Sequence, residues 1–180
     1  MSSTPELHAV PLLRELSAGG VDFVVIGGVA VLFQGYARFT TDLDIVYATN
    51  AANLERLGEV LVTLGASLRG IRAEVPFVPD AHTLKRTSML TLDTPLGSID
   101  LLVDPSGADR YEAMRERADI VELDGVEFRV VAVDDLLSMK RAAGRPQDIA
   151  DVDALLTAQR VRRRIGESPG GDAPPAGESG

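Results

Sequence analysis

Residues 24–46, VVIGGVAVLFQGYARFTTDLDIV, constrain the fold of this chain more than any other stretch. A β-branched strand ends in the glycine pair Gly27 and Gly28, and a later strand carries two carboxylates, Asp42 and Asp44. Alternate residues of a strand point to the same face, so these two side chains project together. Neighbouring carboxylates repel and raise one another's pKa unless a cation lies between them. The pattern therefore predicts a divalent cation, and oxygen-only ligands favour Mg²⁺ or Mn²⁺.

The rest of the chain divides into helical and strand-like segments. Apolar periodicity predicts helices over Pro5–Ala18, Val29–Phe33, Ala51–Leu64 with Asn50 as N-cap, Tyr111–Ala118, Val133–Ala143 and 147 to about 163. Apolar runs between turn residues predict strands over Phe23–Ile26, Leu43–Tyr47, Phe77–Val78, Leu84–Leu92, Ser98–Val103, Ile120–Leu123 and Val126–Val131, the last two joined by an Asp124-Gly125 hairpin turn. We therefore expect an α+β fold, with a mixed β-sheet, flanking helices and a C-terminal helical pair.

The length of the chain favours a single domain. We expect it to span residues 1–164, with a core over about 20–132 and C-terminal helices over about 133–163. Residues 165–180 are rich in Gly, Pro, Ser and acidic residues, a composition that predicts a disordered tail.

The composition excludes several classes of protein. The 45% apolar content suffices for a core, and the absence of cysteine excludes disulfides and thiol chemistry. We find neither a signal peptide nor an apolar stretch near the roughly 20 residues that span a bilayer, and we expect a cytoplasmic protein. The histidines His8 and His82 lack spaced partners, which argues against zinc, and Ser88 and Ser98 lack the setting of a hydrolase triad.

The formal net charge of −9 argues against a broad electrostatic grip on nucleic acid. It leaves open a local basic groove, built from Arg69, Arg72, Lys85, Arg86, Lys140, Arg141, Arg145 and the basic residues of 160–164. An acidic chain is better suited to a nucleotide, protein or small-molecule substrate.

A strand, a Gly-Gly turn, a helix and then Asp-x-Asp together resemble the nucleotidyltransferase superfamily, the DNA polymerase beta-like group. That family places a third carboxylate on a later strand, and Asp100 in GSIDLLVDPSG matches it. Asp104 is the rival, but it directly precedes Pro105 and fits a turn better. The segment SMKRAAGRPQDIADVDAL, residues 138–155, resembles the closing segment of small bacterial nucleotidyltransferases related to AbiEii-type toxins.

The resemblance implies a role for each carboxylate. Asp42 and Asp44 would bind two metal ions, and Asp100 would complete the site on the nucleophile side and accept the proton of the acceptor. Two such ions, roughly 3.5–4 Å apart, stabilise both ends of an in-line displacement.

It also implies a nucleotide site made of Gly27, Gly28, Arg38, Thr40, Lys140, Arg145 and Asp148. The glycines would let the triphosphate approach the backbone. Lys140 would reach the phosphates, Thr40 would orient Asp42, and Asp148 would orient Lys140 or Arg145. Two simpler interpretations stay open: Arg38 as a surface arginine, and the Asp148–Asp151 segment as an ion-pair network that joins two helices.

The predicted function is therefore metal-dependent transfer of an NMP group from an NTP to a hydroxyl of RNA (tRNA among them), protein or a small molecule. By resemblance, the setting would be a toxin with an antitoxin partner. The first alternative is an enzyme that modifies a small molecule, as aminoglycoside nucleotidyltransferases do. The second is a non-catalytic relative that binds a nucleotide or a partner protein.

Overall fold

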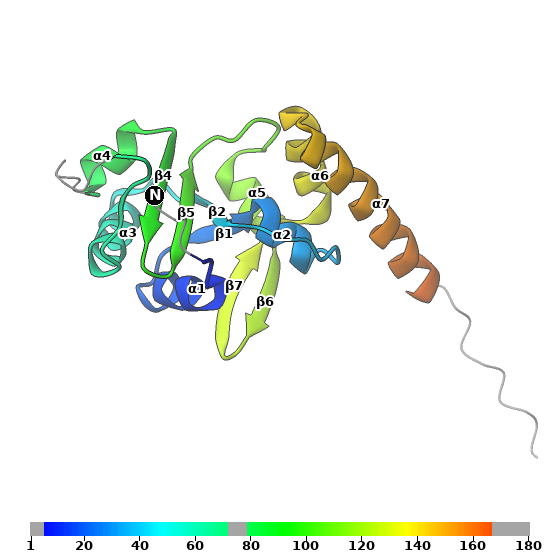
Figure 1. Ribbon diagram of the computed structural model, residues 1–180, viewed down its shortest axis with the longest axis horizontal. Helices are drawn as coiled ribbons and strands as arrows, with labels where there is room; N and C mark the ends of the chain where they lie inside the picture. The colour runs from blue at the N-terminus through cyan, green and yellow to red at the C-terminus, as the bar shows by residue number, and fades with distance from the viewer. Residues whose placement is uncertain (1–5, 72–78, 167–180) are drawn as a thin grey trace, which may run out of the picture.

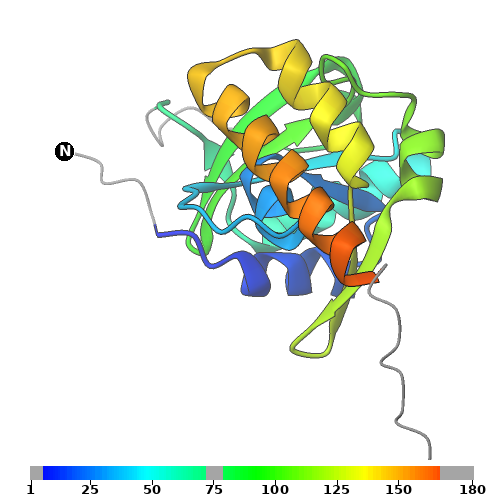
Figure 2. The ribbon, with the colours of Figure 1, turned by 90° about the vertical axis from the view of Figure 1, so that its right-hand side faces the viewer.

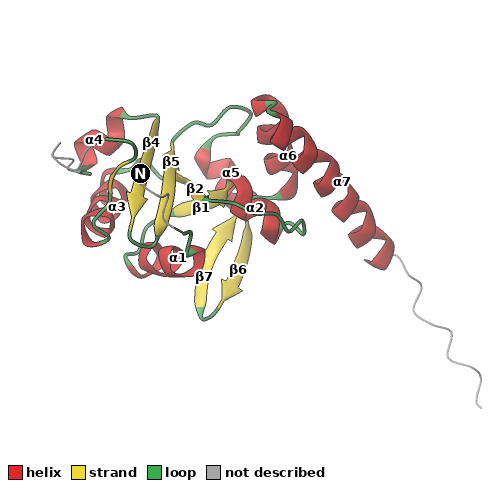
Figure 3. Cartoon of the chain, viewed as in Figure 1, coloured by secondary structure: helices red, strands yellow, loops and turns green. Residues whose placement is uncertain are grey.

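The computed structural model describes residues 6–71 and 79–166 (Figure 1). The helices are α1 Ala9–Ala18, α2 Gly27–Phe33, α3 Ala51–Thr63, α4 Ala81–Arg86, α5 Tyr111–Arg117, α6 Val133–Ala143 and α7 Pro146–Gly166. The strands are β1 Phe23–Ile26, β2 Asp42–Tyr47, β3 Ser67–Leu68, β4 Met89–Thr94, β5 Gly97–Leu102, β6 Asp119–Leu123 and β7 Val126–Val130 (Figure 3).

Within the described residues, seven strands form one mixed sheet in the order β3-β4-β5-β2-β1-β7-β6. Strand β2 pairs antiparallel with β1 and parallel with β5, and β1 pairs parallel with β7. The α+β fold and the mixed sheet are as predicted. This order places the two strands that carry the expected carboxylates, β2 and β5, side by side near the middle of the sheet.

An aliphatic core supports these central strands. Leu43 and Ile45 alternate with the two aspartates of β2 and are fully buried. Helices α1 and α3 contact one another, and α3 contributes the buried polar residue Asn53. The Asn53 side chain accepts from the main-chain N–H of Asp22 and donates to the carbonyls of Asp22 and Ala48, at 2.7–3.0 Å. It therefore ties the helix to the start of β1 and the end of β2.

Helices α6 and α7 are the predicted C-terminal pair. They pack against each other, and Figure 2 shows α7 running across the molecule beside α6. Helix α6 ends at Gly144, which adopts a left-handed conformation, and α7 begins two residues later at Pro146. None of the helices in the described ranges combines the length and apolar character that crossing a bilayer requires.

Local signals located several elements correctly. Strand β1 and helix α6 have the predicted bounds, and the Asn50 side chain caps α3 by accepting from the Asn53 N–H at 3.0 Å. The hairpin turn at Asp124 and Gly125 is also confirmed, with φ of 51° and 73°.

Other boundaries were predicted wrongly. The strand predicted from Leu84 is a helix as far as Arg86, because Asp80 accepts from the Thr83 N–H at 2.8 Å and starts α4. Helix α1 begins at Ala9 rather than Pro5, and β3 was not predicted at all. The strand predicted at 77–78 and almost all of the predicted tail, from residue 167 on, lie outside the described residues.

Candidate active site

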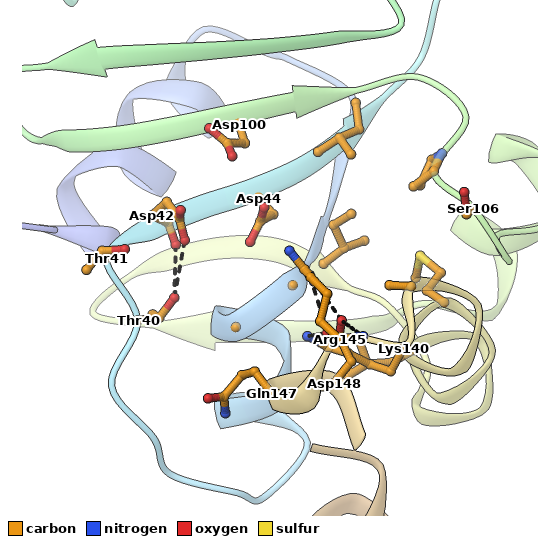
Figure 4. A pocket seen from close by; sticks show the side chains of 18 of the residues that line it. Thr40, Thr41, Asp42, Asp44, Asp100, Ser106, Lys140, Arg145, Gln147 and Asp148 are labelled. Atoms are coloured by element: carbon orange, nitrogen blue, oxygen red, sulfur yellow. Dashed lines mark hydrogen bonds and ion pairs between the residues drawn. The ribbon is translucent and has the colours of Figure 1, made fainter. Parts of the chain in front are cut away.

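A cavity of about 610 Å³ lies where β2 and β5 meet helices α2, α6 and α7 (Figure 4). All ten residues that the sequence singled out line it: Gly27, Gly28, Arg38, Thr40, Asp42, Asp44, Asp100, Lys140, Arg145 and Asp148. The chain thus brings together residues from five separate elements, the loop before β2 and the turn between α6 and α7. Their chemical roles stay predictions.

The three carboxylates extend from neighbouring strands toward the cavity (Figure 4). Asp44 on β2 lies opposite Asp100 on β5 in a parallel register, and Asp42 lies one alternation before Asp44. The Asp100 side chain is 9% exposed, whereas the Asp42 side chain is 31% exposed. The site therefore has a buried side at Asp100 and a more open side at Asp42, with Asp44 between them in sequence register and partly buried.

The glycine pair gives Asp44 its space. Gly27 has a φ of +64°, and a Cβ atom at this position would collide with the Asp44 carboxylate. A Cβ atom at Gly28 would lie 2.5 Å from Thr40 Oγ1 and 3.0 Å from Arg38 Nη2. The Gly28 N–H donates a hydrogen bond to Asp44. That the turn admits phosphate stays a prediction; in the structure the turn packs against the Asp44 carboxylate.

Burial and mutual repulsion make Asp44 a strongly perturbed acid. Burial is the largest cause, Asp42 and Asp100 add to it, and together they raise the pKa of Asp44 to about 7 despite the opposing charge of Lys140. Burial also raises the pKa of Asp100, and Arg69 offsets part of that increase. A bound cation would therefore stabilise this cluster of carboxylates.

Arg69 is the site residue that the sequence did not identify, except as one member of a possible basic groove. It follows β3, and its Nη2 donates to Asp100 Oδ1 at 2.7 Å. Its Nη1 lies 4.0 Å from Asp42 Oδ2. The guanidinium therefore lies between two of the three carboxylates.

The cationic side of the cavity comes from the C-terminal helices. Lys140 on α6 is 6% exposed, and its Nζ lies 2.9 Å from both Asp148 Oδ1 and Asp151 Oδ2. Both of these aspartates are fully buried on α7. Burial alone would raise the pKa of Asp148, but hydrogen bonds from Arg145 and Lys140 lower it to about 2. The ion-pair network that joins two helices is therefore present.

Two arginines complete this network. Arg145 Nε donates to Asp148 Oδ2 at 2.7 Å. Arg38 Nη2 donates to Asp151 Oδ2 at 3.1 Å, and its Nε lies 2.8 Å from Asp151 Oδ1. The Arg38 side chain is 16% exposed, so the interpretation of a surface arginine is wrong, and a carboxylate holds it at the cavity.

The remaining predicted residues lie where the sequence suggested. Thr40 Oγ1 is 3.4 Å from Asp42 Oδ1, a long hydrogen bond from the loop before β2. Asp104 is exposed in the bend after β5, as expected for the rejected third carboxylate. One wall of the cavity is apolar, with Met89, Leu102, Pro105, Leu136 and Met139. No local pattern indicated this wall, because its residues come from distant elements.

The donor set fits a divalent cation at Asp42 and Asp44. These two carboxylates share a strand face, and their all-oxygen ligands suit Mg²⁺ or Mn²⁺. As they stand, no three acidic or histidine side chains in residues 6–71 and 79–166 converge on one ion. Asp100 instead forms its ion pair with Arg69.

Comparison with solved structures supports the fold. The chain resembles a lincosamide antibiotic adenylyltransferase, LnuA, solved with lincomycin bound, with a TM-score of 0.59 and 14% identity over 85% of this chain and 99% of that one. It also resembles ANT(2″)-Ia, solved with adenylyl-2″-tobramycin, with a TM-score of 0.52 and 12% identity over 86% and 89% of the two chains. At these identities the likeness shows the fold alone.

Comparison of sequences identifies the family. No curated protein gives a significant match. Residues 12–163 match the model of a family described as nucleotidyltransferase of unknown function (DUF6036), a range that includes every strand of the sheet and all the residues that line the cavity. The chain therefore belongs to this nucleotidyltransferase family and is a transferase.

Proposed function

We propose that this nucleotidyltransferase moves an NMP group from an NTP to a hydroxyl group of a small molecule, with Mg²⁺ or Mn²⁺ as cofactor. The observation that carries the proposal is the opposition of charges across one cavity: Asp42, Asp44 and Asp100 extend from the sheet, and Lys140 and Arg145 face them from the C-terminal helices. Nucleotidyl transfer needs both signs of charge, because the phosphates are anionic and the acceptor must lose a proton.

The residues of the cavity divide this work. Asp42 and Asp44 would hold the divalent ion, which when bound neutralises charge on the phosphates. Lys140, Arg145 and Arg38 would attract the triphosphate. Asp100 would take the proton of the acceptor hydroxyl, whose oxygen bonds to the α-phosphorus as the bond to the bridging oxygen breaks and pyrophosphate leaves.

The pairing of the basic residues favours a small acceptor over RNA. Arg69, Lys140 and Arg145 were candidates for a basic groove, but each is ion-paired with a carboxylate of the chain itself. These contacts gather the three residues around one cavity, which suits a single triphosphate better than the many phosphates of a nucleic acid. Together with the net charge of −9, this weakens the RNA alternative.

The size and lining of the cavity also support a small acceptor. Its volume of about 610 Å³ is typical of sites that enclose small molecules, which commonly combine an apolar wall with a few polar groups. Two structural neighbours adenylylate antibiotics or hold an adenylylated one. ATP is therefore the first nucleotide to test, with lincosamides and aminoglycosides as the first acceptors.

The other parts of the prediction remain hypotheses. A toxin role, a tRNA acceptor and an antitoxin partner rest on the resemblance alone, and the use of NTPs favours a cytoplasmic location. A non-catalytic relative that binds nucleotide or a partner protein would keep its function without Asp44.

The decisive experiment begins with calorimetric titration of the four NTPs into wild-type protein and into Asp42→Asn/Asp44→Asn protein, each with and without Mg²⁺. We expect metal-dependent binding of at least one NTP, lost in the variant. A pyrophosphate-release assay with antibiotic, tRNA and protein acceptors then identifies the acceptor class. Folded wild-type protein that binds no NTP, alone or with acceptors present, would contradict the proposal.

A further inference from the structure

We propose that Arg69 is the resident counter-cation of this site: it neutralises Asp100 and the outer oxygen of Asp42 in place of a second metal ion. The site would then take up one divalent ion, at Asp42 and Asp44, rather than two. This inference rests on the proposed function, which requires a metal ion. It concerns the number of metal ions that the residues of the site allow to bind.

The contacts of Arg69 are those that a metal ion would otherwise make. Its Nη2 donates to the buried Asp100 carboxylate at 2.7 Å, and its Nη1 approaches Asp42 Oδ2 at 4.0 Å. A charge-assisted hydrogen bond of this length to a buried carboxylate is among the stronger polar contacts in proteins. Asp100 Oδ1 is thus already engaged by a permanent positive charge.

Arg69 is built into the sheet and does not merely rest against the carboxylates. Its backbone N–H donates to Thr91 O at 3.0 Å, which extends the pairing of β3 with β4 by one residue. Its Nε donates to Asp93 Oδ1 at 3.3 Å, and Asp93 accepts the Ser98 hydroxyl at 2.7 Å. These contacts hold the guanidinium in place independently of Asp100, so a metal ion would have to displace a doubly anchored group.

The formal charges agree with this arrangement. Asp42, Asp44, Asp93 and Asp100 contribute four negative charges when ionised, and Arg69 with one divalent ion contributes three positive charges. A second divalent ion beside Arg69 would leave the cluster with excess positive charge. Like charges held within a few ångströms in a partly buried site repel strongly.

Counting bound ions tests the proposal. We would titrate Mn²⁺ into each protein at pH 8 without nucleotide and measure free Mn²⁺ by electron paramagnetic resonance. We expect one Mn²⁺ per wild-type chain, two per Arg69→Gln chain and one per Arg69→Lys chain, since lysine keeps the charge. Arg86→Gln, which changes an exposed arginine on α4 away from the cavity, is the matched control and should bind one.

A second variant covers the case in which Arg69→Gln fails to fold. If Arg69 holds Asp100, then Asp100→Asn should still bind one Mn²⁺ with less than a threefold change in affinity, whereas Asp44→Asn should lose the ion. Thermal unfolding adds a readout independent of catalysis: Mn²⁺ should raise the melting temperature of Arg69→Gln more than that of wild type.

Three results would overturn the proposal. Two Mn²⁺ ions per wild-type chain would mean that Arg69 is displaced, and one per Arg69→Gln chain would mean that it blocks nothing. A loss of Mn²⁺ from Asp100→Asn would make Asp100 a ligand. If wild type binds Mn²⁺ and transfers NMP in any of these cases, only this inference fails; absence of both metal and NTP binding in wild type would remove the proposed function as well.

Discussion

Asp44 lies directly opposite Asp100 in the parallel register of β2 and β5, so two carboxylates extend from the same face of neighbouring strands. Like charges at such positions destabilise a sheet, and both groups have raised pKa values as a result of burial and repulsion. The central strands therefore carry a cost in stability at the point where the proposed chemistry takes place.

We expect Asp44→Asn to stabilise the metal-free protein at pH 8. The pKa of Asp44 is about 7 when folded against a usual 3.8, so the folded protein holds this proton more tightly than the unfolded chain. The tighter binding of this proton stabilises the folded protein fully below about pH 4, and that stabilisation is lost as the pH rises through 7. The free energy of unfolding of the variant should exceed that of wild type by up to roughly 4 kcal/mol at pH 8, and the two values should match near pH 4. Urea denaturation at several pH values measures this; a difference that does not change with pH would contradict it.

Replacing Lys140 with methionine should strongly destabilise the protein. The substitution takes the shared cation from Asp148 and Asp151, which keep only Arg145 and Arg38 as partners, and breaking a buried ion pair from one side costs up to about 3–5 kcal/mol. Lys85→Met, at an exposed lysine on α4, is the control and should change the free energy of unfolding by less than about 0.5 kcal/mol. Equal effects of the two substitutions in urea denaturation would show that the network contributes little.

Gly27→Ala and Gly65→Ala form a matched pair, because both glycines have a φ of +64°. Each alanine should cost about 1–2 kcal/mol from backbone strain. Only at Gly27 does the new methyl group meet the Asp44 carboxylate, whereas Gly65 has open space around it. We therefore expect Gly27→Ala to weaken Mn²⁺ binding at least tenfold and Gly65→Ala to leave it unchanged. Equal metal affinities would mean that Asp44 can move aside freely.

Asn53→Ala should lower stability without affecting the site. It leaves the partly buried N–H of Asp22 and the buried C=O of Ala48 without their side-chain partner, at roughly 1–3 kcal/mol for each group left unsatisfied, whereas the C=O of Asp22 still accepts from the Ala48 N–H. Asn50→Ala removes only the cap of the same helix, which typically costs about 1 kcal/mol. We expect a larger loss for Asn53→Ala by urea denaturation and unchanged Mn²⁺ affinity for both. A change in metal affinity would reveal a connection between α3 and the cavity.

Much of this arrangement was predictable from local patterns. Asp42 and Asp44 share a face because strand periodicity is two, and the glycine pair marks the turn that makes room for them. Asp100 followed from strand alternation once the resemblance supplied a reason to look for a third carboxylate. Lys140 and Asp148 were recognised in the same way, although their burial and the strength of their pairing were not.

Arg69 could not be predicted, because its position depends on pairing between strands. Strand β3 has two residues, too few for any alternation to be visible, and its register against β4 is what carries Arg69 to Asp100. The error at Leu84 has a different and local cause: the apolar run there suits a strand, and a single capping aspartate, Asp80, decides for a helix. For Arg69, by contrast, contacts between distant segments determine what local propensity leaves undecided.

The carboxylates of the cavity and the basic residues that face them come from different parts of the chain, so they are synthesised at different times. All three carboxylates precede residue 101, whereas Lys140, Arg145 and the buried aspartates that hold them come from α6, α7 and the turn that joins them. A growing chain can therefore complete the sheet with an anionic site that has no lysine to face it. Affinity for a triphosphate would arise only when the last two helices dock, so truncation before α6 should yield a chain that attracts metal ions and repels nucleotides.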